Sequence, residues 1–150
     1  MRSIPRSRTN PQFNGETLHE TLAHAQIGYE HIAELGGRRG KSPNNEPSPN
    51  GYWRVRGFRN YADYALTTPF ALGLARLMAL GAEHRCAIMC AEAVWWRCHR
   101  RIVTDYLLCH GEVVMHILGP LQAKEASLTP GAIERPDGTI IYPAVSPQQE

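Results

Sequence analysis

The chain has 150 residues and a formal net charge of +2, and its composition, with 43% hydrophobic and 20% charged residues, is ordinary for a soluble protein. This length predicts one domain with a single core, over residues 1–150. The sequence has no run of about 18 apolar residues and no basic-then-apolar leader, so we exclude a membrane helix and a signal peptide and expect a cytoplasmic protein.

The first sixty residues carry the basic excess of the chain, with nine Lys or Arg against five Glu. Arginine supplies 14 of the 16 basic residues of the whole chain. The excess is modest, and it suits a small phosphate-bearing ligand as well as a nucleic acid. Nucleic-acid binding is therefore an open alternative.

Three stretches of the first half have the apolar spacing of helices. They are residues 15–25, 56–66 and 68–81, with Pro69 suited to the first turn of the third. Residues 27–32 are a strand candidate, and the following Gly36 and Gly37 indicate a close backbone approach. Residues 41–53 are rich in Pro and Asn, and we expect this long loop to be a functional lid, with disorder as the alternative.

Most of the reactive side chains lie in one unit of the second half. Residues 85–90 and 113–117 are apolar runs of strand length, and a helix is expected between them, from Trp96 or Arg97 to Cys109, with a glycine just beyond as its stop. A helix between two strands has the length of a right-handed βαβ crossover. The sequence therefore predicts an α/β fold with a parallel sheet.

Residues 118–150 are expected to form a peripheral extension of the domain. Within them, residues 132–143 carry Pro136-Asp-Gly between two β-prone pieces. This pattern predicts a hairpin.

Ligands of parallel α/β sheets bind at the carboxyl ends of the strands. This rule gathers five side chains of the unit at one edge: Cys90, Glu92, Cys98, His99 and Arg100. Glu92 has room between alanines to act as a general base, although a carboxylate there can equally pair with an arginine. His99 is the natural acid–base partner near neutral pH. A thiol at a helix N-terminus beside an arginine favours its thiolate, so Cys90 or Cys98 is a candidate nucleophilic or redox cysteine.

A metal site at the same edge would use Cys90, Cys98, His99 and Glu92. We favour thiol chemistry over a metal, because zinc ligands commonly come in pairs a few residues apart on a turn, whereas Cys98 and His99 as neighbours on a helix diverge by about 100 degrees. The sequence therefore predicts no metal and no other cofactor. All four cysteines lie between residues 86 and 109, unlike a disulfide framework spread over loops, and we expect reduced thiols.

The first turn of the expected helix is also a candidate anion site. Free backbone N–H groups at a helix N-terminus, with Arg100 beside them, suit a phosphate or a carboxylate. The alternative is that the arginines of this helix form a solvated face.

Eight short motifs occur in order along the chain. They are Arg2-Ser-Ile-Pro, Pro11-Gln-Phe-Asn, Gly28-Tyr29 with His31, Leu35-Gly-Gly-Arg, Phe58 with Tyr61-Ala-Asp-Tyr64, Met89-Cys-Ala-Glu-Ala, Cys98-His-Arg, and Gly111 with His116-Ile. Together they resemble the blocks of the family called domain of unknown function 488, over about residues 2–118. The resemblance implies a three-layer α/β/α fold with a mostly parallel sheet and a polar pocket, but no established reaction.

One feature departs from the resembled family. Its members typically begin with a strand and a helix, followed by a second strand that ends in an Asp-Val-Arg-Ser type motif, whereas here Met1 directly precedes Arg2 and Ser3. We therefore expect the family's first strand and helix to be missing, and an open reading frame to extend roughly 25 to 30 residues upstream. A missing strand would leave an exposed sheet edge, which favours self-association.

Two functions remain as hypotheses. The first is a small α/β enzyme that acts on a phosphate- or nucleotide-like ligand, with Glu92 and His99 in proton transfer and Cys90 or Cys98 as the thiol. The alternative is a noncatalytic regulatory module that binds an anion or a nucleic acid, without a membrane partner. In both, the residues expected to hold the ligand are Arg2, Ser3, Arg38, Tyr61 and Arg100.

Overall fold

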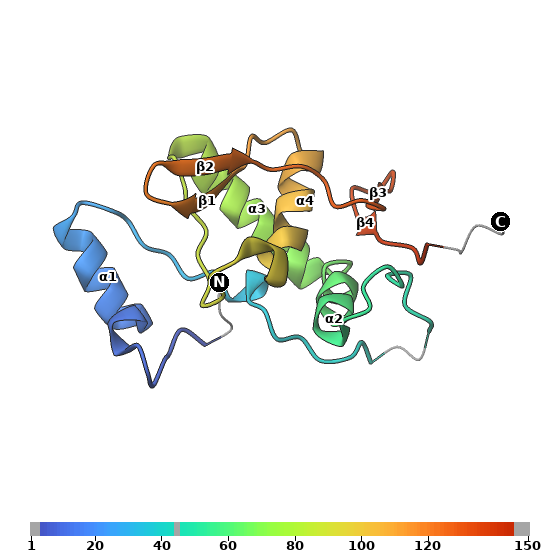
Figure 1. Cartoon of the computed structure of the whole chain (residues 1–150), viewed down its shortest axis with the longest axis horizontal. Coiled ribbons are helices and arrows are strands. Elements are labelled where there is room, and N and C mark those ends of the chain that lie inside the picture. The colour runs from blue at the N-terminus through green and yellow to red at the C-terminus, as the bar shows by residue number, and fades with distance from the viewer. Residues whose placement is uncertain (1–3, 44–45, 146–150) are drawn as a thin grey trace.

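The computed structural model describes residues 4–43 and 46–145 (Figure 1). Its α-helices are α1 (Gly15–His24), α2 (Arg56–Tyr64), α3 (Thr68–Glu83) and α4 (Arg100–Cys109), and short 3-10 turns are η1 (Pro11–Phe13), η2 (Ala33–Leu35) and η3 (Trp95–Arg97). The strands are β1 (Met115–Gly119), β2 (Gln122–Glu125), β3 (Ile133–Glu134) and β4 (Ile140–Ile141). The predicted mixed α/β content is confirmed.

The helices predicted from apolar spacing are confirmed close to their expected bounds. Pro69 lies in the first turn of α3, where a missing N–H group costs no helical hydrogen bond. Gly111 follows α4 with a φ of 81°, the left-handed conformation that closes a last helical turn. The start of α4 differs from the prediction. It begins at Arg100, because the residues before it form the separate turn η3.

The predicted parallel sheet is wrong. In the described parts of the chain, β1 pairs with β2 and β3 pairs with β4, and both pairs are antiparallel. Residues 27–32 and 85–90, which we expected to be strands, contain no strand. The strand expected at residues 113–117 is present as β1, but it pairs with β2, the next strand along the chain, and not with a distant strand. Pairing with a neighbour closes a much shorter loop and costs less chain entropy than a crossover does. The apolar runs alone did not distinguish these two arrangements.

The second half of the predicted lid loop is attached to α2. The hydroxyl of Ser48 and the side-chain amide of Asn50 both donate to Asp63 Oδ1, at 2.6 Å and 2.7 Å. Asn50 is fully buried. Residues 44 and 45 of the loop lie outside the described residues. The described end of the loop is therefore part of the packed core.

Aromatic side chains dominate the hydrophobic core. The largest ones come from α2, α3, α4 and the segments that flank them: Trp53, Tyr61, Phe70, Tyr106 and Tyr142. The Tyr61 hydroxyl donates to the carbonyl of Leu35 at 2.8 Å, and the Tyr106 hydroxyl donates to the carbonyl of Ala65 at 3.1 Å. Buried tyrosines therefore both fill the core and satisfy backbone oxygens.

The close approach of α3 to η2 depends on a glycine. A Cβ atom on Gly73 would lie 2.7 Å from Glu34 Cβ and 3.1 Å from Leu35 Cγ. Leu35 is fully buried beneath this contact. Gly73 thus fixes the position of η2 and of the glycines that follow it.

The C-terminal segment closes the core. The predicted hairpin is confirmed as β3 and β4, and just after it Tyr142 is fully buried. The Tyr142 hydroxyl and the backbone N–H of Thr129 each donate to the buried carboxyl of Asp105, both at 2.8 Å. The backbone N–H of Tyr142 donates to Asn50 Oδ1 at 2.9 Å. Burial raises the pKa of Asp105, and these two donors oppose the shift.

Helix α1 lies apart from this core. None of its residues is buried, and Figure 1 shows it at one end of the molecule, away from α2, α3 and α4. No single helix among the described residues is long and apolar enough to cross a membrane. Only α2 and α3 taken together reach that length and composition, and they are bent by 81° at their junction.

The Asp105–Tyr142 contact gives a stability prediction. We expect Tyr142→Phe to lower the free energy of unfolding by about 1 to 3 kcal/mol, because a buried carboxylate oxygen loses its donor. Urea denaturation followed by circular dichroism measures the change. Tyr52→Phe is the matched control, since the Tyr52 hydroxyl makes no hydrogen bond with the described residues. Equal stability of the two variants would contradict the prediction.

Candidate cysteine and histidine site

The break between η3 and α4 positions two functional side chains. Cys98 ends η3 in an extended conformation, with φ −121° and ψ 145°, and His99 is the N-cap of α4, with φ −57° and ψ −18°. The two residues are therefore not successive positions of one helix. The expectation that their side chains diverge, which we used against a metal site, is wrong for this reason.

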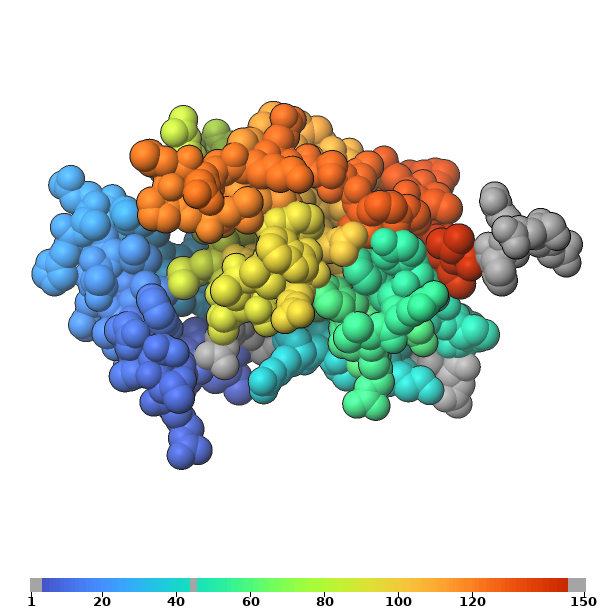
Figure 2. All heavy atoms as spheres, viewed as in Figure 1, coloured from blue at the N-terminus to red at the C-terminus, as the bar shows by residue number. Residues whose placement is uncertain are grey.

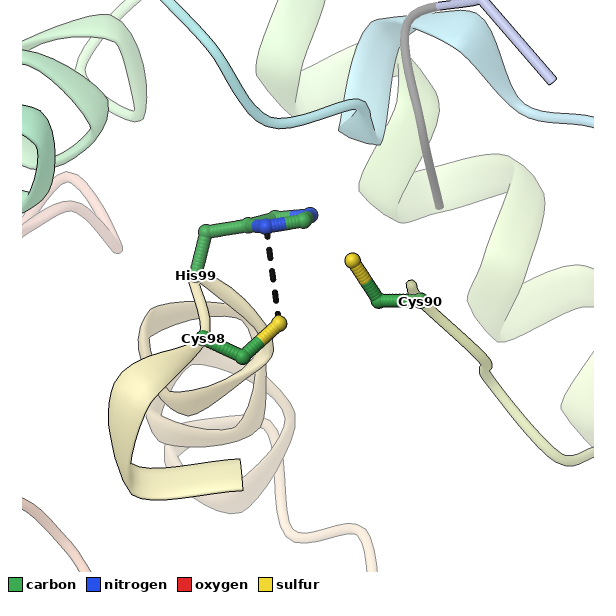
Figure 3. Close-up of side chains that lie close together, drawn as sticks. All are labelled: Cys90, Cys98 and His99. Carbon is green, nitrogen blue, oxygen red and sulfur yellow. Dashed lines mark hydrogen bonds between the residues drawn. The ribbon is translucent and has the colours of Figure 1, made fainter. Parts of the chain in front are cut away.

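Cys98 and His99 meet Cys90, which arrives on the extended segment before η3 (Figure 3). The two sulfur atoms and a ring nitrogen of His99 all lie within 4.8 Å of one another. The distance between Cys98 Sγ and His99 Nδ1 is 3.6 Å. We call these three residues the Cys–His cluster. Figure 2 shows its segment, in yellow, at the surface between the hairpin β1–β2 and α2.

Arg100 holds the Cys98 sulfur in place. Its backbone N–H and its Nε donate to Cys98 Sγ at 3.5 Å and 3.3 Å, and its Nη2 donates to the carbonyl of Glu92 at 2.6 Å. Cys98 is only 3% exposed, yet it lies outside the apolar core cluster. The buried sulfur of Cys98 therefore contacts polar partners and not the apolar core.

The two thiols of the cluster are electrostatically coupled. The neighbouring thiol of Cys98 lowers the pKa of Cys90, with a smaller contribution from His99. The neighbouring thiol of Cys90, together with burial, raises the pKa of Cys98. Of the two thiols, Cys90 therefore gives up its proton more readily, while the Arg100 guanidinium contacts the Cys98 sulfur.

The His99 ring is held from two sides. The Tyr61 ring lies 4.7 Å from it, centroid to centroid, and a Cβ on Gly37 would lie 2.7 Å from His99 Nδ1. The close approach indicated by Gly36 and Gly37 is thus the contact with His99. His99 Nε2 is buried and has no hydrogen-bond partner among the described residues.

The helix N-terminus does not offer the free amides that we expected. Besides the Arg100 N–H on the sulfur, the N–H groups of Arg101 and Ile102 donate to the carbonyls of Cys98 and His99, both at 3.0 Å. The prediction of an anion site built on free amides is wrong. An anion here would depend on side chains.

Other predicted site residues lie at the border of the cluster or away from it. Glu92 is exposed, and its carboxylate makes no hydrogen bond or ion pair with the described residues. The Tyr61 hydroxyl is bonded to Leu35, so only its ring faces His99. Arg38 is exposed, with a φ of 60°. Arg2 and Ser3 lie outside the described residues.

Sequence reasoning missed two partners of the predicted residues. Arg39, not Arg38, binds the η2 region: its guanidinium donates to the carbonyls of Ala33 and Gly36 at 2.7 Å and 2.9 Å. Trp95 stacks on His116, with ring centroids 4.0 Å apart and planes 3° apart. The Trp95 stack joins segments that are distant in the sequence, so no spacing rule indicated it. Arg39 lies only three and six residues from its two carbonyl partners, but no motif indicated that its side chain turns back onto η2.

These observations define a small mixed α/β protein with a cysteine and histidine centre. The family model described as Domain of unknown function DUF488 matches residues 1–107, and the chain belongs to that family. The resemblance found in the sequence is confirmed. Comparison with curated proteins and with solved structures gave no match.

The Trp95–His116 stack gives a pH prediction. Burial, and then the positive charges of Arg100 and Lys124, lower the pKa of His116. The folded state therefore binds this proton less readily than the unfolded state, so stability falls as the pH drops below about 6.5, the unfolded value. We expect His116→Phe, which keeps a ring on Trp95, to lose less stability than the wild type between pH 7 and pH 5. Urea midpoints at the two pH values measure this, and parallel losses would contradict it.

Proposed function

We propose that this chain is a small enzyme whose reaction centre is the Cys–His cluster and whose substrate is a phosphate- or nucleotide-like anion. The observation that carries the proposal is the convergence of two thiols and an imidazole from separate segments. We also place the protein in the cytoplasm, because its four described cysteines are free thiols, which persist in a reducing compartment.

The way in which the cluster is built supports a chemical role. A structural cysteine behaves as a small apolar side chain and packs in the core. Cys98 instead accepts two N–H groups from Arg100, and His99 buries a ring nitrogen without a partner. A buried polar atom without a partner costs about 1 to 3 kcal/mol. Such costs are typical of sites that hold reactive groups in place.

The surroundings supply acid–base and anion-binding groups. His99 is the natural proton carrier near neutral pH. Glu92 is exposed on the loop that Arg100 fixes through its carbonyl, so its carboxylate can meet a bound ligand. The guanidinium of Arg100 has five N–H groups, of which its Nε contacts the Cys98 sulfur and its Nη2 the carbonyl of Glu92. Its remaining donors suit a phosphate oxygen.

A substrate panel tests the proposal. The full chain is incubated with nucleoside mono- and triphosphates and with p-nitrophenyl phosphate, and products are followed by liquid chromatography. We expect turnover of at least one compound, and a loss of about 10²- to 10⁴-fold in kcat/KM for Glu92→Gln and for His99→Asn, because each removes a proton-transfer group. Cys86→Ser, at an exposed thiol away from the cluster, is the control.

The outcomes separate the two functional classes. Tight binding of a nucleotide without turnover would show that the protein is a noncatalytic binding module and would contradict the proposed enzyme. Turnover that survives both Glu92→Gln and His99→Asn would place the reaction elsewhere in the molecule. Neither binding nor turnover across the panel would overturn the proposal.

A further inference from the structure

We infer that the Cys–His cluster is a binding site for a divalent cation of the zinc class. The inference deepens the proposed function, because it names the cofactor of the same reaction centre. Its ligands are Cys90 Sγ, Cys98 Sγ and one ring nitrogen of His99, which lie within 4.8 Å of one another.

The spacing of the ligand atoms fits a tetrahedral site. Zinc lies about 2.3 Å from a thiolate sulfur and about 2.0 to 2.1 Å from an imidazole nitrogen, which at tetrahedral angles puts S and N about 3.6 Å apart and two sulfurs about 3.8 Å apart. Cys98 Sγ and His99 Nδ1 are 3.6 Å apart. Small movements of Cys90, on its extended segment, complete the triangle.

The chemistry of the ligands fits as well. Two thiolates and a neutral imidazole balance the charge of a divalent cation, and the protons of the two thiols are released to solvent when the cation binds. Sulfur and imidazole nitrogen are the donors that zinc prefers over calcium or magnesium. The two N–H groups of Arg100 on Cys98 Sγ are hydrogen bonds of the kind that orient a metal ligand.

A metal ion also explains why a histidine is half-buried here. An apolar ring would fill the space between Tyr61 and Gly37 equally well, but it would not place a nitrogen, Nδ1, 3.6 Å from the Cys98 sulfur. A disulfide between Cys90 and Cys98 would need neither the imidazole nor the arginine. The presence of two thiols and an imidazole in one cluster, with Arg100 on one of the sulfur atoms, therefore favours a metal site over packing or a disulfide.

Three protein ligands leave the fourth position of the metal for water or substrate, which is the arrangement of catalytic zinc sites. Glu92 follows the ligand Cys90 by two residues and is exposed, and its backbone carbonyl accepts a hydrogen bond from Arg100, which also contacts the ligand Cys98. A carboxylate there can take the proton of a metal-bound water. With the cation bound, His99 acts as a metal ligand and not as the proton carrier, so the cation gives the proposed enzyme its electrophile and Glu92 alone provides the base.

Metal analysis of the full chain, purified under reducing conditions, tests the inference. We expect about one zinc per chain by mass spectrometry. We also expect that cobalt, used as a substitute, gives the thiolate charge-transfer band and the strong visible absorption of a tetrahedral site. Cys90→Ser and Cys98→Ser should each lose most of the metal and weaken the charge-transfer band. Cys86→Ser and Cys109→Ser, which change the two other free thiols, should keep both.

Two glycine variants test the geometry of the site without substituting any of its ligand residues. Gly37→Ala places a methyl group 2.7 Å from the present position of His99 Nδ1, so the ring must shift, whereas a Cβ on Gly40 meets no atom within 4 Å. We expect Gly37→Ala to weaken zinc binding about 10- to 100-fold, the usual effect of disturbing the support of a ligand. Gly40→Ala should bind like the wild type. Competition with a chromophoric chelator measures both affinities.

Each outcome decides between the two proposals. A wild-type chain with four reactive thiols and no uptake of zinc or cobalt overturns the metal site, as does equal metal content in all four serine variants. If Cys98→Ser is unfolded by circular dichroism, Cys90→Ser and Gly37→Ala still give the answer. If Glu92→Gln loses turnover although the chain binds no metal, the proposed enzyme stands and the proposed cation site is overturned. If the chain binds metal but turns over no substrate, the cation site stands and the proposed enzyme is overturned.

Discussion

Three buried tyrosine hydroxyls hold the core together, because each must find a partner away from water. Tyr61 uses the carbonyl of Leu35, Tyr106 that of Ala65, and Tyr142 the carboxyl of Asp105. Each of these bonds joins elements that are distant in the sequence. Residues 4–43 and 46–145 form two small hairpins and no large sheet, so within them these side chains take over the role that strand pairing has in an ordinary α/β domain.

The cluster depends on the same framework. The Tyr61 hydroxyl fixes Leu35, and with it the turn that brings Gly37 against His99, while the Tyr61 ring covers another side of the imidazole. Arg100 then joins the Cys98 sulfur to the loop that carries Glu92. The side chains of the cluster thus sit on a loop and at a helix start, but packed aromatic residues and the contacts of the half-buried Arg100 set their positions. This is how a site on irregular backbone obtains defined geometry.

Much of the local structure was predictable, and the long-range pairing was not. Apolar spacing with Pro69 and Gly111 located the helices because those signals act within a few residues. The sheet prediction failed because residues 85–90 have the composition of a strand and a partner cannot be read from composition. For the site, the sequence named Cys90, Cys98 and His99, and the structure brings these three side chains together. The prediction that the side chains of Cys98 and His99 diverge was wrong, because Cys98 is extended at the end of η3 and the two residues do not belong to one helix. The stacking of Trp95 on His116 depends on a tertiary contact that no local pattern contains.

The bond between the backbone N–H of Tyr142 and the side chain of Asn50 spans 92 residues of sequence. On a ribosome that adds about 5 to 20 residues per second, Asn50 emerges roughly 5 to 18 seconds before its partner does. Until Tyr142 emerges, Asn50 Oδ1 lacks this donor, and Asp105, which is made 37 residues before Tyr142, lacks the Tyr142 hydroxyl. Contacts of such long sequence separation also slow the final folding step, because the loop must close before the contact contributes. During synthesis the nascent chain therefore has helices but an incomplete core. In this state Trp53 and Tyr106 are exposed to chaperones and to other chains.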